Sequence, residues 1–321
     1  MAAICLSVIA VVGADAQNWP EKPIRIVVPF AAGGSTDTTA RIIAEGMQKV
    51  AGQPIVVENK PGGLGIIAVE TMAKAAPDGY TLMMGSGMVN GAVVAVHPDK
   101  FSINYDKDVT AVGRVADVPA VYVATAKNFP VSNIDELRAY AKANPGKVRY
   151  CSTGPGTALH IEMTIFQKKE GLQFVHVPYP TGQTAPDLIN GDLHFCSLNI
   201  IQTRPMVKAG TIKPIIVTTD TRLQDFPDTP TMAELGHPEL NANYWGAVFA
   251  PAATPKPVLA KLHEFINKAH GMPDVKDKFQ SNQMIPVVSP TIEDAIKWNA
   301  GEVDRWRKNF KDSGIDKSEI K

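Results

Sequence analysis

The chain has 321 residues, of which 45% are hydrophobic and 20% are charged, an ordinary globular balance with enough length for two domains. Its 32 lysines and arginines equal its 32 aspartates and glutamates, so the formal net charge is zero. Without a basic field or a run of like charges, the composition argues against a nucleic-acid partner.

The amino-terminal stretch MAAICLSVIAVVGADA is an apolar run that ends in the small-residue pattern Ala14-Asp15-Ala16. Such a run is typical of a secretory leader, and it is too short to be a stable transmembrane anchor. We therefore expect residues 1–16 to be a signal peptide, cleaved near Ala16, and the mature protein to be periplasmic. Because no lysine or arginine precedes the run, a buried amino-terminal strand or helix is the alternative.

Strand and helix patterns alternate along the rest of the chain. Strand-like runs lie at residues 23–29, 54–58, 80–84, 120–126, 148–152, 173–179, 192–198, 212–219 and 243–251. Helical spacing of apolar residues marks residues 36–52, 66–75, 132–146, 157–171, 184–192, 254–271, 274–282 and 289–310. This order predicts α/β units with parallel strands, in which ligands bind beyond the carboxyl ends of the strands.

The units divide into two lobes. We expect residues 17–123 and 247–321 to form a discontinuous first lobe and residues 124–246 to form the second. The chain would cross between the lobes near residues 120–127 and 244–250, and the last helices would return to the first lobe. Two lobes joined by two strands make a hinge around a cleft. We expect such a protein to act as a monomer.

Two cysteines of the expected mature chain, Cys151 and Cys196, lie at the ends of predicted strands. A disulfide between them is possible in an oxidising compartment, but the interpretation favours two buried free thiols. No CxxC motif or Cys/His spacing typical of a metal site occurs, so neither a metal nor a cofactor is expected.

The stretch PFAAGGSTDTTAR, residues 29–41, joins the first strand to the first helix. Its glycines allow a ligand to approach the backbone, and Ser35 or Thr36 is expected to cap the helix. The first-turn N–H groups then form an anion site that needs no Arg or Lys, although a plain tight turn is the alternative. Asp37 is expected to stabilise the dipole, or to contact a ligand ammonium or the opposite lobe. The candidate ligand contacts are Phe30, Ala31, Gly33, Gly34, Ser35 and Asp37.

The stretch STGPGTALH, residues 152–160, repeats this design in the second lobe, with Thr157 as the expected helix cap. If the lobes close, two helix amino termini face each other across the cleft, which suits a small organic acid. His160 is either a ligand contact or a structural hydrogen-bonding residue. The candidate ligand contacts are Ser152, Thr153, Gly156, Thr157 and His160.

Four further candidates follow other predicted strands. Ser86 and Asn90 come after the third strand, and Asn199 ends another. Tyr179 either stacks on a ligand and closes the cleft or belongs to the core. No GxSxG elbow and no carboxylate-oriented histidine is visible, so we predict a protein that is not an enzyme. A periplasmic hydrolase that uses Ser152 is an alternative.

The motifs occur together in a recognisable order. They are WPEKPIRIVVPFAAGGSTDTTAR, VENKPGG, APDGYTL, YCSTGPGTALH, HVPYPTGQTAPDLINGDL, FPDTPTMAELG and YWGAVFAPAATPKPV. With them the chain resembles the tripartite tricarboxylate transporter substrate-binding proteins, the Bug family of periplasmic receptors, over essentially its whole mature length.

The resemblance implies a type II periplasmic-binding-protein fold with Venus-flytrap closure. It also implies capture of a small mono- or dicarboxylic acid for the membrane permease subunits of a tripartite transporter. In that family the loop after the first strand holds a ligand carboxylate largely through backbone groups and water, and it corresponds to residues 30–37 here. The SxGxGT-type loop matches residues 152–157, with His160 following. A ligand-sensing partner of a two-component membrane kinase is an alternative role.

The chain departs from the family pattern at a few positions near the expected cleft rim. Its glycine run, residues 62–65, is poorer in glycine, and Pro180 follows HVPY where a polar residue is common. Cys196 and Ser197 replace a stretch that is commonly acidic or amide-bearing. We expect these differences to affect ligand choice and not the fold.

Overall fold

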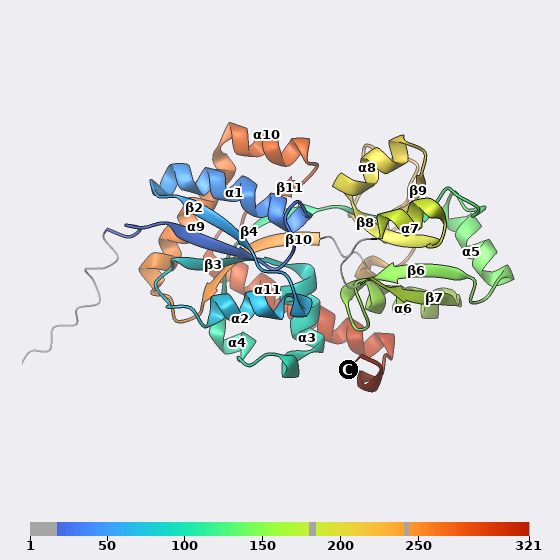
Figure 1. Ribbon diagram of the computed structural model, residues 1–321, viewed down its shortest axis with the longest axis horizontal. Coiled ribbons are helices and arrows are strands. Elements are labelled where there is room, and N and C mark those ends of the chain that lie inside the picture. Colours follow the sequence, from blue (N-terminus) through green and yellow to red (C-terminus); the bar gives the residue numbers. More distant parts are fainter. Residues whose placement is uncertain (1–17, 180–183, 241–243, 321) are drawn as a thin grey trace, which may run out of the picture.

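The computed structural model describes residues 18–179, 184–240 and 244–320, so the expected leader and Pro180 lie outside the described residues. Two mixed β-sheets, each covered by helices, form two lobes side by side (Figure 1). This arrangement confirms the predicted two-lobed α/β fold.

The sheet of the first lobe contains six strands, and the order of elements agrees with the predicted βαβαβ pattern. From edge to edge they are β11 (Ile285–Pro286), β4 (Val109–Val118), β10 (Tyr244–Pro251), β3 (Thr81–Ser86), β1 (Ile24–Val28) and β2 (Ile55–Asn59). β1 pairs in parallel with β2 and β3, whereas β10 is antiparallel to β3 and β4.

The sheet of the second lobe contains five strands. In order they are β7 (Phe174–Pro178), β6 (Val148–Ser152), β8 (Phe195–Asn199), β5 (Ala120–Thr125) and β9 (Ile212–Val217). β6 is parallel to β7 and β8, and β5 is antiparallel to β8 and β9. The predicted strands thus form, and each sheet joins a parallel part to an antiparallel one.

Helices cover both sheets. The α-helices are α1 (Ser35–Ala51), α2 (Ile66–Ala73), α3 (Val94–Val96), α4 (Tyr105–Asp108), α5 (Ile134–Ala143), α6 (Ala158–Glu170), α7 (Ala185–Asn190), α8 (Ile200–Lys208), α9 (Lys256–Gly271), α10 (Pro273–Ser281) and α11 (Ile292–Ser313). Shorter turns are η1 (Gly63–Gly65), η3 (Pro98–Lys100), η4 (Pro238–Leu240), η5 (Lys317–Ile320) and the π-helix η2 (Gly87–Val93). Within the described residues, no helix combines the length and apolar character that a membrane span requires.

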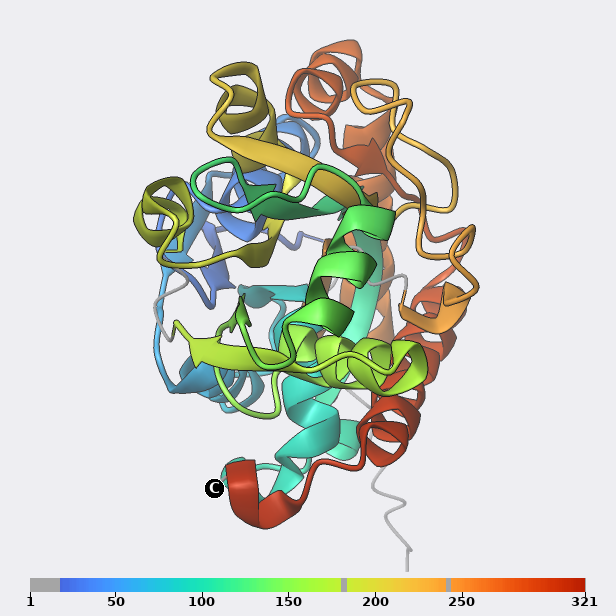
Figure 2. The same cartoon turned by 90° about the vertical axis from the view of Figure 1, so that its right-hand side faces the viewer.

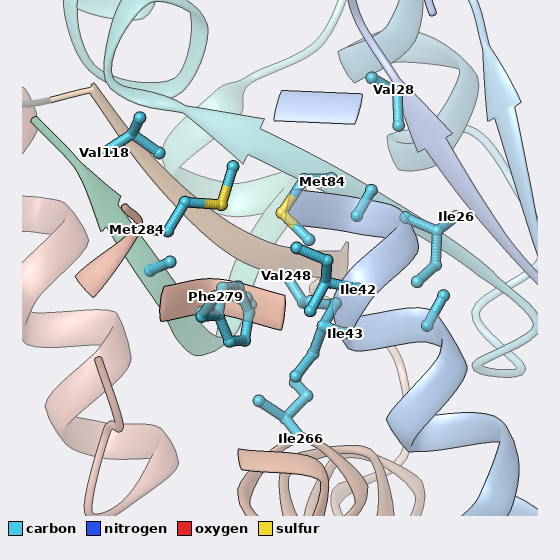
Figure 3. Close-up of a cluster of buried hydrophobic side chains, with 14 of the residues drawn as sticks. Ile26, Val28, Ile42, Ile43, Met84, Val118, Val248, Ile266, Phe279 and Met284 are labelled. Atoms are coloured by element: carbon cyan, nitrogen blue, oxygen red, sulfur yellow. The ribbon is translucent and has the colours of Figure 1, made fainter. Parts of the chain in front are cut away.

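The first lobe is apolar on both faces of its sheet. Ile26 and Val28 of β1 pack in a core cluster with α1 and α9 (Figure 3), while Val27 belongs to the cluster on the opposite face. Since side chains alternate along a strand, a sheet covered on both faces needs an apolar residue at every position. This requirement explains the largely apolar run IRIVV, in which the half-buried Arg25 is the one polar residue.

The chain changes sheets between Val118, the last residue of β4, and Ala120, the first residue of β5. It returns before Tyr244, where β10 begins in the first sheet. Sheet membership therefore changes a few residues earlier than the predicted crossings near 120–127 and 244–250. The division into 17–123, 124–246 and 247–321 otherwise stays a prediction.

The sequence suggested that the last long helix belongs to the first lobe. In the structure this helix contacts both lobes. α11 packs against β4 and η2 of the first lobe and against α6 of the second (Figures 1 and 2). The apolar face of α11 therefore packs against both lobes. The helical spacing of its apolar residues predicts a buried face but not which lobe covers it.

The sequence analysis assigned no element to the long strand β4, which lies between β11 and β10. Its ten residues are buried on nearly every position, yet they include Arg114 and Asp117. These two charges form an ion pair of 2.6 Å, and the Arg114 guanidinium lies 4.5 Å from the Trp298 ring centre. A search for apolar runs misses such a strand, because it contains charged residues that are paired with each other in the folded protein.

Cys151 and Cys196 form a disulfide, so the interpretation as two free thiols is wrong. β6 and β8 are parallel neighbours with Tyr150 opposite Phe195, and the next residue on each strand is a cysteine. Their Cα atoms are 5.1 Å apart, which is within the range of protein disulfides. The residues are 45 positions apart in the chain, so only the strand pairing brings them together.

We expect the double substitution Cys151→Ala with Cys196→Ala to lower the free energy of unfolding by about 2–4 kcal/mol, because the link restricts the unfolded chain. Urea unfolding of the mature protein with and without a reductant measures the effect, and the double variant should not respond to the reductant. Two free thiols in the unfolded, unreduced mature chain would contradict the disulfide.

Candidate functional site

The carboxyl ends of the parallel strands meet where the two lobes join, a region that we call the lobe border. Ser86 at the end of β3 pairs with Gly246 near the start of β10. Asn199 at the end of β8 pairs with Ala120 at the start of β5. Since β5 and β10 both begin where the chain enters their sheet from the other lobe, the loops after β3 and β8 flank the border (Figure 1).

The first loop, residues 30–37, leads from β1 into α1. Gly34 is the N-cap residue and no side chain caps the helix, so the expected capping by Ser35 or Thr36 is wrong. The first hydrogen bond of the helix runs from the Thr38 N–H to the Gly34 carbonyl, 2.9 Å, and the three preceding N–H groups have no intrahelical partner. These donors belong to the half-buried Ser35 and Thr36 and to the buried Asp37, and the residues before them, 31–34, are exposed.

Asp37 holds the first loop in shape from below. Its carboxylate accepts hydrogen bonds of 2.9 Å from the Gly33 N–H, Arg41 Nε and Asn59 Nδ2, and Asn59 also donates to the Phe30 carbonyl at 3.0 Å. Burial alone would raise the pKa of Asp37, but these hydrogen bonds outweigh it and hold the pKa below its usual value. With 2% exposure, the side chain faces into the fold and positions the loop.

Ser86 and Asn90 shape the π-helix η2, which follows β3. The Ser86 hydroxyl accepts from the Val89 N–H at 3.3 Å, and the Asn90 amide oxygen accepts from the Ser86 N–H at 3.2 Å. Asn90 also donates to the Tyr105 hydroxyl at 3.1 Å and is fully buried. These bonds use both side chains inside the fold, so their predicted role as ligand contacts has no support in the geometry.

The second loop, residues 152–157, is held by its own side chains. The Thr157 hydroxyl donates to the Gly154 carbonyl at 2.6 Å, and the Ser152 hydroxyl accepts from the Gly154 N–H at 3.0 Å. Thr157 is the N-cap residue of α6, as expected, but its side chain does not cap the helix. The N–H groups of the first turn of α6 therefore have no side-chain cap, as in α1.

A histidine that the sequence analysis did not select lies beneath this loop. His176 Nε2 is 2.6 Å from the Ser152 hydroxyl, and the His176 ring stacks on His160 with centroids 4.2 Å apart. Burial, with a smaller effect of His160, lowers the pKa of His176 to about 4, so the ring is neutral at pH 7. His160 Nδ1 accepts from the Gly156 N–H at 3.0 Å, which is the structural role that was left open.

Tyr179 and Asn199 are also engaged within the second lobe. The Tyr179 hydroxyl donates to Asp187 at 2.5 Å, and burial together with this hydrogen bond raises the pKa of Tyr179 to about 12. Asn199 caps α8 by accepting from the Gln202 N–H at 3.0 Å. Both residues are half-buried beside the lobe border, where they shape its wall.

The two lobes touch through the second loop. The Thr153 hydroxyl lies 3.5 Å from the Met88 sulfur of η2. Gly156 has φ = +71°, and a Cβ built on it would lie 3.0 Å from Ile320 and 3.1 Å from His97, so the chain needs glycine there. In the described part of the chain no hydrogen bond or ion pair joins the first loop directly to the second. A solute that bridges the loops stays a prediction.

One carboxyl group with a strongly raised pKa, that of Glu162, lies in the core. Glu162 on α6 accepts from the Tyr122 hydroxyl at 2.9 Å and is 1% exposed. Burial raises the pKa of Glu162 to about 8, against the effects of Tyr122 and Arg305, so the group is protonated at pH 7. It is sealed in the core, and Ser152 with His176 lacks a carboxylate partner among the described residues.

Two α/β lobes whose strand ends face a common border define the periplasmic-binding-protein class, whose members capture solutes and are not enzymes. The family model described as "Tripartite tricarboxylate transporter family receptor" matches residues 39–315, and the chain belongs to this family. The Bug proteins are relatives within it. Protein BugT of Bordetella pertussis is 34% identical over 304 residues, which cover 94% of this chain and 92% of BugT.

Solved structures agree with this assignment. MatC from Rhodopseudomonas palustris with bound malate superimposes with a TM-score of 0.79 at 30% identity, and the match covers 91% of this chain and 100% of MatC. An R. palustris protein with adipate gives a TM-score of 0.82 at 30% identity, with 92% of this chain and 99% of that protein covered. The predicted family and the predicted fold are both confirmed.

We expect Asp37→Asn to lower the free energy of unfolding at pH 7 by about 1–3 kcal/mol, because buried donors lose a charged acceptor. The folded-state pKa of Asp37 is lowered, so its contribution is present above the unfolded value of about 4 and is lost as the pH falls through the folded value. Urea unfolding of both proteins from pH 7 down to pH 3 should show the gap closing, and a gap that stayed constant would refute the role of the charge.

Glu162 should affect stability in the opposite direction. Its folded pKa is raised, so between about pH 4 and pH 8 the folded state holds a proton that the unfolded state has released, and stability falls as the pH rises. Glu162→Gln removes this effect. The free energy of unfolding of the variant minus that of the parent should grow by about 1 kcal/mol per pH unit across pH 5–7. Parallel pH curves for the two proteins would contradict the assignment.

Proposed function

We propose that the protein captures a small mono- or dicarboxylic acid between its lobes and delivers it to the membrane permease subunits of a tripartite transporter. It does so in the periplasm, as a monomer, after removal of a leader near Ala16. The observation that carries the proposal is the pair of helices α1 and α6, whose amino termini have no side-chain cap and follow loops at the lobe border.

Recognition rests on backbone donors. Charge-assisted hydrogen bonds from N–H groups to a carboxylate are among the stronger ones, and the dipoles of both helices favour the same negative charge. The exposed glycines Gly33 and Gly34 carry no side chain over the start of α1, and the half-buried Thr153 adds a hydroxyl at the border. Related receptors with malate and with adipate support the carboxylate class.

Closure follows from contacts that a solute makes with both lobes at once. A ligand that touches the first loop alone binds the open and closed forms equally and shifts nothing. A ligand that also reaches the first turn of α6 favours the closed form by the free energy of the added contacts. The lobes would then rotate about the two crossings at Pro119 and before Tyr244.

We expect micromolar or tighter binding of at least one acid from a panel of mono-, di- and tricarboxylates, about −8 kcal/mol or more favourable. Gly34→Val should weaken it at least about tenfold, because its side chain covers the donors of α1 while φ stays ordinary. Titration calorimetry measures both. Gly271→Val, an exposed position with no atom near the new side chain, is the matched control.

The proposal fails if no acid in the panel binds the purified, ligand-stripped parent. It fails in its assignment of the site if Gly34→Val binds the acid as tightly as Gly271→Val does. A melting-temperature scan of all three proteins without ligand separates lost binding from lost folding.

A further inference from the structure

A groove of about 630 Å³ separates the lobes on the side of α8. The second lobe contributes α8 and the loop after β9, and the first lobe contributes the end of α10. Six residues that line it and bear on its chemistry are Ile201, Arg204, Lys208, Asp225, Phe226 and Gln283. None of them was singled out from the sequence.

The groove adjoins the lobe border on both of its walls. On the second lobe, Ile201 lies in the first turn of α8, two residues after Asn199 at the end of β8. On the first lobe, Met284 follows Gln283, and its sulfur is 3.5 Å from the Thr39 hydroxyl of α1. Figures 1 and 2 show α8 lying opposite α10, beyond the start of α1. The groove is lined by α8, the loop after β9 and the end of α10, and by no residue of the first or second loop, so only an extended solute held at the first loop would reach it.

The groove carries one unneutralised positive charge. Arg204 pairs with Asp225 at 2.9 Å, so those two charges compensate each other. Lys208 lies on the same face of α8 and is exposed, and its ammonium group forms no ion pair or hydrogen bond within the described residues. Neither the first nor the second loop offers a cationic side chain of its own. Lys208, the last residue of α8, is thus a cation on the groove wall that is available to an anionic group.

Gln283 stands where a helix end favours glycine. Its backbone φ is +54°, and its backbone N–H donates to the Gln280 carbonyl at 2.9 Å. The Met284 N–H donates to the Phe279 carbonyl, also at 2.9 Å. These bonds are those of a Schellman motif, whose left-handed position is usually glycine. A side chain there costs stability, and the residue that carries this cost lines the groove.

We propose that the groove receives the second acidic group of the solute, with Lys208 of one lobe and Gln283 of the other as its contacts. The inference rests on the proposed function and sharpens it: the receptor prefers linear dicarboxylates to acids that lack the second charge. A diacid that spans from the first loop to the groove touches both lobes, so the second contact also favours closure.

The test compares adipate and succinate with their half-amides, which keep the length and lose one charge. Whichever of the two diacids the parent binds with higher affinity, it should bind that diacid more tightly than the corresponding half-amide. Lys208→Gln should weaken that diacid about fivefold at low salt and leave the half-amide within about twofold, which is the range of a solvent-exposed ion pair. Added salt should reduce the preference of the parent but not that of the variant. Lys142→Gln, an exposed neutralisation on α5, is the matched control.

Gln283→Gly provides a second test that a purely structural role would fail. Relief of the left-handed residue should raise the melting temperature, while loss of the amide weakens diacid binding about threefold. Asn128→Gly is the matched control, because Asn128 has φ = +55° on an exposed loop of the second lobe. It should raise the melting temperature and leave diacid affinity unchanged.

The outcomes separate this inference from the proposed function. If the parent binds a carboxylate but does not distinguish diacid from half-amide, or if Lys208→Gln weakens both equally, the groove assignment is overturned and the receptor function stands. If no carboxylate of any kind binds the parent, the proposed function and this inference fall together.

Discussion

The pairing of two strands where the chain changes lobes is the constraint on which the rest of the structure depends. β5 and β10 each enter a sheet at the lobe border and run antiparallel to β8 and β3, so the carboxyl ends of β8 and β3 must lie at that border. The parallel strands beside them end there too. Every loop with a candidate binding role is brought to one place by this register, although the loops come from distant parts of the sequence.

Most polar side chains at the lobe border form hydrogen bonds within the fold and hold its loops in shape. Asp37 supports the first loop, Asn90 the π-helix after β3, and Asn199 the start of α8, while Thr157 closes the second loop. Under the proposed function, the solute then meets mostly backbone groups, which are presented at fixed positions. Such preorganised N–H groups lose little freedom when a ligand binds, and they recognise the carboxylate group rather than the rest of the molecule. A side chain at the rim must then distinguish one acid from another.

The disulfide and α11 tie this arrangement together. Cys151 and Cys196 link β6 to β8 directly before the second loop and before Ser197, so two strand ends that carry border loops move as one unit. α11 contacts both lobes on the opposite side of the molecule from the α8 groove (Figure 1). The proposed closure would therefore open or close the groove, and the packing of α11 would either stay intact or slide.

The sequence by itself determined the class of fold, most strand and helix positions and the two border loops. Their signals are local, namely period-two or helical spacing, glycine-rich turns after strands, and helix starts rich in Ser and Thr. Only the tertiary structure decided that Asp37 and Asn90 face inward, that His176 lies under Ser152, that the cysteines are bonded, and that Lys208 lies across a groove from Gln283. The physical reason is the same in each case: these properties depend on pairings between residues far apart in the chain, and strand register and lobe packing set those distances.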